Sequence, residues 1–121
     1  MKIFLTVIFI FQLLSTKLYS LEDCKMCANY ASNAYNYSVK AYYSLNLEDC
    51  KKNSMRAIKE LSMSEEKGYD CSCTAAAKEA SFGKKDAKDA FYSTNLKSCK
   101  HYALRTFKHS GLAQDLAIGC K

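Results

Sequence analysis

The cysteines of this chain recur at a fixed offset of 49 residues, and no other feature constrains the fold as strongly. Shifting the sequence by 49 places Cys24 on Cys73, Cys50 on Cys99 and Cys71 on Cys120 without a gap. Over the 48 positions from 24 to 71 the shift gives 14 identities. Chance matching at ordinary residue frequencies would give roughly three. The sequence therefore predicts an internal duplication of one three-cysteine unit. The first unit is residues 24–71 and the second unit is residues 73–120.

The first twenty residues have the pattern of a secretory signal peptide. Lys2 precedes an apolar run at residues 3–14, which is followed by a more polar stretch at 15–20. The run of about twelve residues is short for a helix that spans a bilayer. We therefore expect cleavage after Ser20, a secreted, extracellular protein, and a single mature helical domain of residues 21–121. A retained interfacial anchor is the alternative.

All seven cysteines lie in the expected mature part. An exported chain of this size buries only a modest core, and disulfides commonly stabilise such chains. Zinc binding is the alternative, but Cys71-Ser72-Cys73 is one residue tighter than the usual Cys-x-x-Cys spacing of zinc sites. We expect disulfides, and neither a metal nor a cofactor.

The chain contains no proline, so nothing in it forbids long helices. Residues 37–43 alternate like a strand, but their counterparts in the second unit, within residues 84–92, are mostly helix formers. Two copies of one unit should share one fold, which favours helix. The prediction is an all-α, disulfide-stapled bundle of two tandem helical hairpins, about four helices. Small residues should allow close helix approach, and aromatic side chains should supply most of the buried area.

Helix ends are expected at three places. Ser44–Asn46 should separate the first two helices, and the second helix should end before Gly68. In the second unit, an interruption at Ser110-Gly111 should separate the last helix from a short final helical stretch that closes on Gly119.

Antiparallel hairpins predict how the cysteines pair. The start of one helix lies near the end of the next, which favours Cys24–Cys71 and Cys73–Cys120, and pseudo-twofold symmetry favours Cys50–Cys99. Cys27 has no cysteine counterpart, because Ala76 occupies the equivalent position. It either forms an intermolecular disulfide, giving a homodimer, or packs as a buried free thiol.

The sequence offers little support for catalysis. The two histidines, His101 and His109, both lie in the fourth predicted helix. Cys99 is two residues from His101, and side chains two apart on a helix point to different sides. The sequence contains no phosphate-binding glycine loop, metalloprotease motif or nucleophile elbow. We expect no catalytic residues and no enzymatic activity.

Charge is distributed unevenly between the units. Residues 21–71 contain 7 Lys and Arg against 8 Asp and Glu, whereas residues 72–121 contain 9 against 4. On a helix, four basic residues of the second unit would form one ridge, flanked by two more and extended by three lysines of the third helix. Such a surface would attract anionic partners in a salt-dependent way. The ridge is Lys97, His101, Arg105 and Lys108; Lys100 and His109 flank it, and Lys84, Lys85 and Lys88 extend it.

These observations predict a secreted, non-enzymatic binding protein or effector of the kind found in invertebrate body fluids, saliva or venom. Its expected partner is an extracellular protein, a glycan or an anionic surface, and not a nucleic acid. A membrane-active toxin or lipid-binding protein is one alternative, and a covalent dimer with a structural role is another. Asn36-Tyr37-Ser38 is a sequon, so Asn36 is a candidate for glycosylation.

Overall fold

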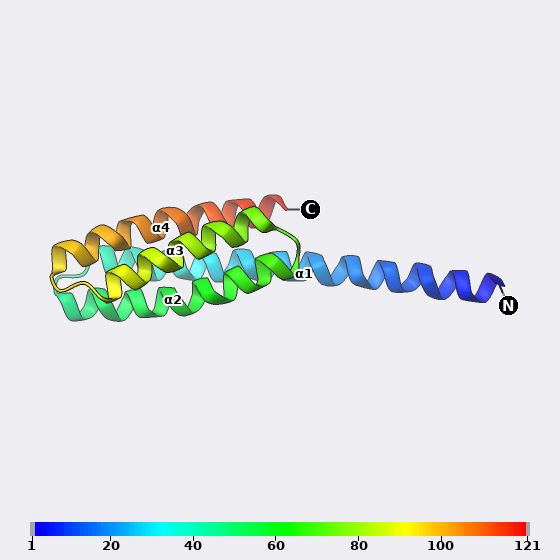
Figure 1. The fold of residues 1–121 in the computed structure, drawn as a ribbon, viewed down its shortest axis with the longest axis horizontal. Coiled ribbons are helices and arrows are strands. Elements are labelled where there is room, and N and C mark those ends of the chain that lie inside the picture. The colour runs from blue at the N-terminus through cyan, green and yellow to red at the C-terminus, as the bar shows by residue number, and fades with distance from the viewer. Residues whose placement is uncertain (1, 121) are drawn as a thin grey trace.

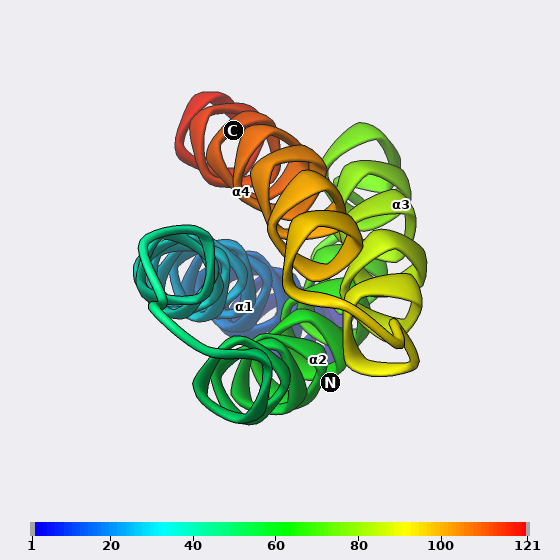
Figure 2. The same ribbon diagram turned by 90° about the vertical axis from the view of Figure 1, so that its left-hand side faces the viewer.

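The computed structural model describes residues 2–120, with the backbone alone for residues 2–20. Four α-helices follow one another along the chain: α1 (Lys2–Tyr42), α2 (Leu47–Asp70), α3 (Thr74–Phe91) and α4 (Leu96–Gly119). They run up and down alternately in a bundle that α4 closes by packing against α1 (Figures 1 and 2). Helices α2 and α4 lie on one diagonal of the bundle, and α1 and α3 on the other. The predicted all-α four-helix architecture is confirmed.

Helix α1 is far longer than its partners, and its N-terminal part projects beyond the bundle as a single helix (Figure 1). The predicted signal segment, residues 1–20, lies outside the residues whose side chains are described, so its cleavage stays a prediction. Within the described part of the chain, no helix has both the length and the apolar character needed to cross a bilayer.

Equivalent residues of the two units start the second helix of each hairpin. The side chain of Asn46 accepts a hydrogen bond of 2.8 Å from the backbone N–H of Asp49, and Asn95 accepts one of 2.8 Å from Ser98. Asparagine is favoured at this N-cap position because its side chain satisfies a helix N–H that has no partner within the helix. The prediction that Ser44–Asn46 separates two helices is confirmed.

The bundle interior is built from alanine, serine and cysteine, with Leu61 as the largest fully buried side chain. Most buried serine hydroxyls donate to the carbonyl four residues earlier, as Ser38 does to Ala34 and Ser54 to Cys50, whereas Ser64 donates to the carbonyl of Cys27 on α1. These hydroxyls therefore have hydrogen-bond partners although they are buried. Such small side chains let the helix backbones approach closely.

Gly68 shows how close this approach is. A Cβ placed on Gly68 would lie 3.0 Å from the Cβ of Ala77 and 3.1 Å from its Cα. Gly68 therefore lies inside α2 at the α2–α3 contact, and the prediction that the helix ends before it was wrong.

The predicted interruption at Ser110-Gly111 was also wrong: Ser110 is buried, and α4 continues to Gly119.

Aromatic side chains lie along the helix seams rather than in the interior, contrary to the expectation that they would supply most of the buried area. Phe107 of α4 packs edge-to-face against Tyr35 and Tyr42 of α1, at 5.6 and 5.8 Å between ring centroids. Tyr35 is nevertheless an exposed side chain. The aromatics thus cover the alanine-rich core from outside.

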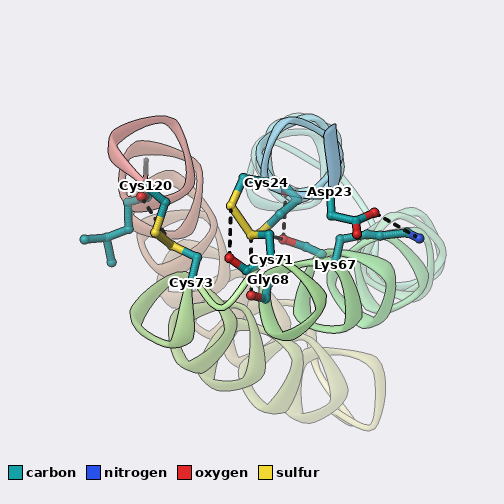
Figure 3. Close-up of a disulfide and its surroundings, with 10 residues drawn as sticks. Asp23, Cys24, Lys67, Gly68, Cys71, Cys73 and Cys120 are labelled. Atoms are coloured by element: carbon teal, nitrogen blue, oxygen red, sulfur yellow. Dashed lines mark hydrogen bonds and ion pairs between the residues drawn. A yellow bond between two sulfur atoms is a disulfide. The ribbon is translucent and has the colours of Figure 1, made fainter. Parts of the chain in front are cut away.

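Three disulfides staple the bundle: Cys24–Cys71, Cys50–Cys99 and Cys73–Cys120. These are the three predicted pairs, two favoured by the antiparallel hairpins and Cys50–Cys99 by the pseudo-twofold symmetry. The first and third lie side by side where α2 turns into α3 (Figure 3). Beside them the carboxylate of Asp23, which is 3% exposed, lies 3.7 Å from the ammonium of Lys67. The Cys50–Cys99 bond joins α2 to α4 near the other end and ties the two hairpins together.

Candidate anion-binding surface

The four residues of the predicted ridge, Lys97, His101, Arg105 and Lys108, are all exposed on α4. Their opposite face carries Cys99, Ala103, Thr106 and Ser110, which are buried. Since every fourth or third residue of a helix returns to the same side, burial of one face leaves the basic face to solvent. The structure thus brings the ridge residues into one row.

Two of the predicted anion contacts already face carboxylates of α3. The guanidinium Nε of Arg105 lies 3.3 Å from Asp86 Oδ1. His109 lies between two acidic side chains, with Nδ1 2.7 Å from Glu79 Oε2 and Nε2 3.5 Å from Asp86 Oδ2. Asp86 is 4% exposed, so these basic groups compensate a buried charge. They contribute less to attracting an external anion than Lys97 and Lys108 do.

The three lysines that were predicted to extend the ridge do not form one group in the structure. Lys84 pairs with Glu65 of α2 at 3.2 Å. Lys85 and Lys88 are exposed on α3. Lys85 lines a hollow of about 440 Å³ that Asp86 and Asp89 also line. The basic extension is therefore interrupted by the acidic residues of the α3–α4 seam.

The N-terminal end of the ridge borders a hollow of about 630 Å³, lined by Tyr42, Leu96, Lys97, Lys100, His101 and Leu104. The ammonium of Lys100 lies 5.7 Å from the centroid of the Tyr42 ring, a cation–π contact that fixes the lysine beside the aromatic. The hollow joins cationic groups to an aromatic and two leucines. It suits an anion that carries an apolar group. We call it the second-unit hollow.

An equivalent hollow, also of about 630 Å³, lies on the first unit and was missed by the sequence analysis. Its lining residues are Leu47, Glu48, Lys51, Lys52 and Phe91. Lys51 stands 5.6 Å from the centroid of the Phe91 ring, as Lys100 stands over Tyr42. Each lining residue lies 49 positions from one in the second-unit hollow, so the repeat itself was the signal that could have found it. We call it the first-unit hollow.

Comparisons with protein-family models, with curated proteins and with solved structures found no significant match to this chain. Its function is therefore inferred from its own residues.

Cys27 is a buried free thiol on α1. Its Sγ lies 3.5 Å from the Ser64 hydroxyl, and burial raises the pKa of the thiol above its ordinary value. A covalent dimer through Cys27 would require this sulfur to leave its buried position.

The sulfurs of Cys24, Cys73 and Cys120 lie within 4.8 Å of one another. Each of them belongs to a disulfide, and because metals bind the free thiolate, this cluster is not a metal site while the disulfides are formed.

The candidate glycosylation residue is accessible. Asn36 is exposed on α1, so a glycan attached there would project into solvent.

Proposed function

We propose that this chain is an exported, non-enzymatic binding protein that recognises an anionic extracellular partner through the α4 ridge. The observation that carries the proposal is the exposed row of Lys97, His101, Arg105 and Lys108, which ends at the second-unit hollow. Acidic proteins and sulfated glycans both present the negative charge that such a row attracts. The three disulfides are consistent with an oxidising extracellular setting.

Contacts of the ridge favour binding over catalysis. His109 is the ridge-flanking residue best placed for acid–base chemistry, yet both of its ring nitrogens face carboxylates of α3. An imidazole held in this way contributes to the packing of α3 against α4. The exposed cationic side chains of the ridge that face no carboxylate of α3 are Lys97 and Lys108, and lysines act as point charges toward an anion.

We also propose that the two hairpins descend from one duplicated unit. The asparagine caps, the disulfide positions and the paired hollows occur at residues 49 apart. After duplication, Glu48 of the first unit corresponds to Lys97 of the second, which removes an acidic group from the ridge. The second unit would then be the copy specialised for an anionic partner.

Reversing two ridge charges tests this proposal on a sulfated glycan, heparin. The double substitution Lys97→Glu and Lys108→Glu is expected to weaken binding roughly tenfold, because each surface charge pair contributes about 0.2–1 kcal/mol and reversal adds repulsion. The measurement is the salt concentration that elutes the protein from immobilised heparin. The variant should elute clearly earlier than the unsubstituted protein.

The matched control is the double substitution Lys59→Glu and Lys78→Glu. Both lysines are exposed, the change in net charge is the same, and Lys59 occupies in the first unit the position of Lys108. This control should keep nearly all of the retention. Equal losses in both variants would show that net charge alone drives retention, and the ridge would not be the binding surface.

A further inference from the structure

The most exposed large apolar side chains gather at one end of the bundle. Leu45 is 92% exposed, Tyr92 74% and Tyr43 72%. They lie in the α1–α2 connection (residues 43–46) and the α3–α4 connection (residues 92–95), which meet at the same end (Figures 1 and 2). We call this the loop end. Apolar groups exposed near one another often mark an interaction site.

Each tyrosine is held in position by its neighbour. Tyr43 packs edge-to-face on Tyr42, and Tyr92 does the same on Phe91, with both pairs of centroids 5.1 Å apart. Tyr42 and Phe91 in turn line the second-unit and first-unit hollows, respectively. The second-unit hollow lies between α1 and α4 and the first-unit hollow between α2 and α3, so each hollow borders the aromatic that supports one of the protruding tyrosines.

Lysines surround this apolar tip. Within about two helical turns of the two connections there are seven lysines and four carboxylates. The lysines come from all four helices, so they form a collar around the bundle rather than a row along one helix. They are Lys40, Lys51, Lys52, Lys85, Lys88, Lys97 and Lys100, and the carboxylates are Glu48, Asp49, Asp86 and Asp89.

We propose that the loop end docks on an anionic lipid membrane. Leu45, Tyr43 and Tyr92 enter the interfacial layer, where tyrosine places its ring among apolar chains and its hydroxyl in water. The lysine collar meets the lipid phosphates, and the two hollows place Lys51 and Lys100 where a headgroup anion can reach them. This inference rests on the proposed function in one respect: Lys97 of the α4 ridge and Lys100, which flanks it, serve in both proposals.

The shape and size of the tip favour a membrane over a protein partner. Three side chains of this kind expose on the order of 400 Å². A stable protein interface needs about 800 Å² from each partner and a complementary hollow to receive such groups. A bilayer interface accepts protruding groups of any shape, and its anionic headgroups complement the collar.

Vesicle binding tests the proposal directly. The protein is taken from the medium of cells that express the full chain, and is sedimented with vesicles of phosphatidylcholine, with or without about one-third phosphatidylserine. We expect binding to the anionic vesicles only, weakened by high salt. Leu45→Asp should reduce the partition coefficient roughly tenfold or more, because it exchanges an inserted leucine for a repelled carboxylate. Residue 45 is in an exposed connection, so the variant should fold normally.

The matched control is Ile118→Asp, which makes a comparable change in an exposed side chain, 65% accessible, near the other end of the bundle. It should leave vesicle binding unchanged. Equal binding of Leu45→Asp and the unsubstituted protein would overturn the proposal. So would a dimer, detected by light scattering, that Leu45→Asp dissociates while vesicles remain unbound. Retention on heparin without vesicle binding would overturn this inference and leave the proposed function standing.

Discussion

Replacing Cys24 and Cys71 by alanine is expected to lower the free energy of unfolding by about 4 kcal/mol. The disulfide joins residues 47 apart, and in the chain-entropy description a closed loop of that length restricts the unfolded chain by about this amount. In the folded protein the bond fixes the start of the bundled part of α1 to the turn between α2 and α3 (Figure 3). The measurement is guanidinium chloride unfolding, followed by circular dichroism without reductant.

The second unit offers a matched comparison. Cys73 and Cys120 are also 47 residues apart, so their replacement by alanine should cost a similar amount. Cys27→Ala removes a buried sulfur without removing a crosslink, and should cost only about 1 kcal/mol. If both crosslink variants lost no more than Cys27→Ala does, the disulfides would not be the staples of this bundle.

Leu61→Ala is expected to destabilise the protein by about 3–5 kcal/mol, near the upper part of the range for buried leucine truncations. Leu61 is fully buried in a cluster whose other fully buried members are alanines. Alanine has no rotatable side chain that could move into the space left behind, so the cavity would remain. Both δ-methyl carbons also lie close to where a Cβ on Gly83 would be, at 3.3 and 3.4 Å, which shows how tightly α2 and α3 meet there.

Leu112→Ala is the control for this truncation, because Leu112 is 50% exposed on α4. It should cost less than about 1 kcal/mol. Denaturant unfolding of both variants measures the difference. A cost for Leu61→Ala that equals the cost for Leu112→Ala would mean that the middle of the bundle is not packed around Leu61.

The repeat explains why so much of the architecture could be predicted. It favoured helix over strand, and together with antiparallel hairpin packing it favoured the same three cysteine pairs that the structure contains. These features depend on the order of residues within one unit and on antiparallel pairing. Residue order and antiparallel pairing can both be inferred from the sequence without knowing how the helices are rotated about their axes.

The sequence did not specify how each helix is rotated about its own axis. On α1, Ala34 is buried whereas its neighbour Tyr35 is exposed. Alanine and aromatic residues alternate closely on this helix, and a small rotation exchanges them.

The candidate site, too, was predictable where it depends on residue order and unpredictable where it depends on how the helices pack. Exposure of the ridge on α4 follows from helical spacing, whereas the contacts of Arg105 and His109 with Asp86 require α3 to pack beside α4. The two hollows each combine residues from helices that are distant in sequence, such as Lys51 and Phe91. Only the packed bundle brings those residues together.

Peptide mapping by mass spectrometry, on unreduced protein collected from the medium of expressing cells, tests the central claim most directly. That claim is that a duplicated unit is exported and then closed by one disulfide within each hairpin and one between them. The predicted result is an N-terminus at Leu21, the linked pairs Cys24–Cys71, Cys50–Cys99 and Cys73–Cys120, and an unlinked Cys27. A chain retained in the cell with all thiols free, or a bond from Cys24 to Cys99, would contradict it.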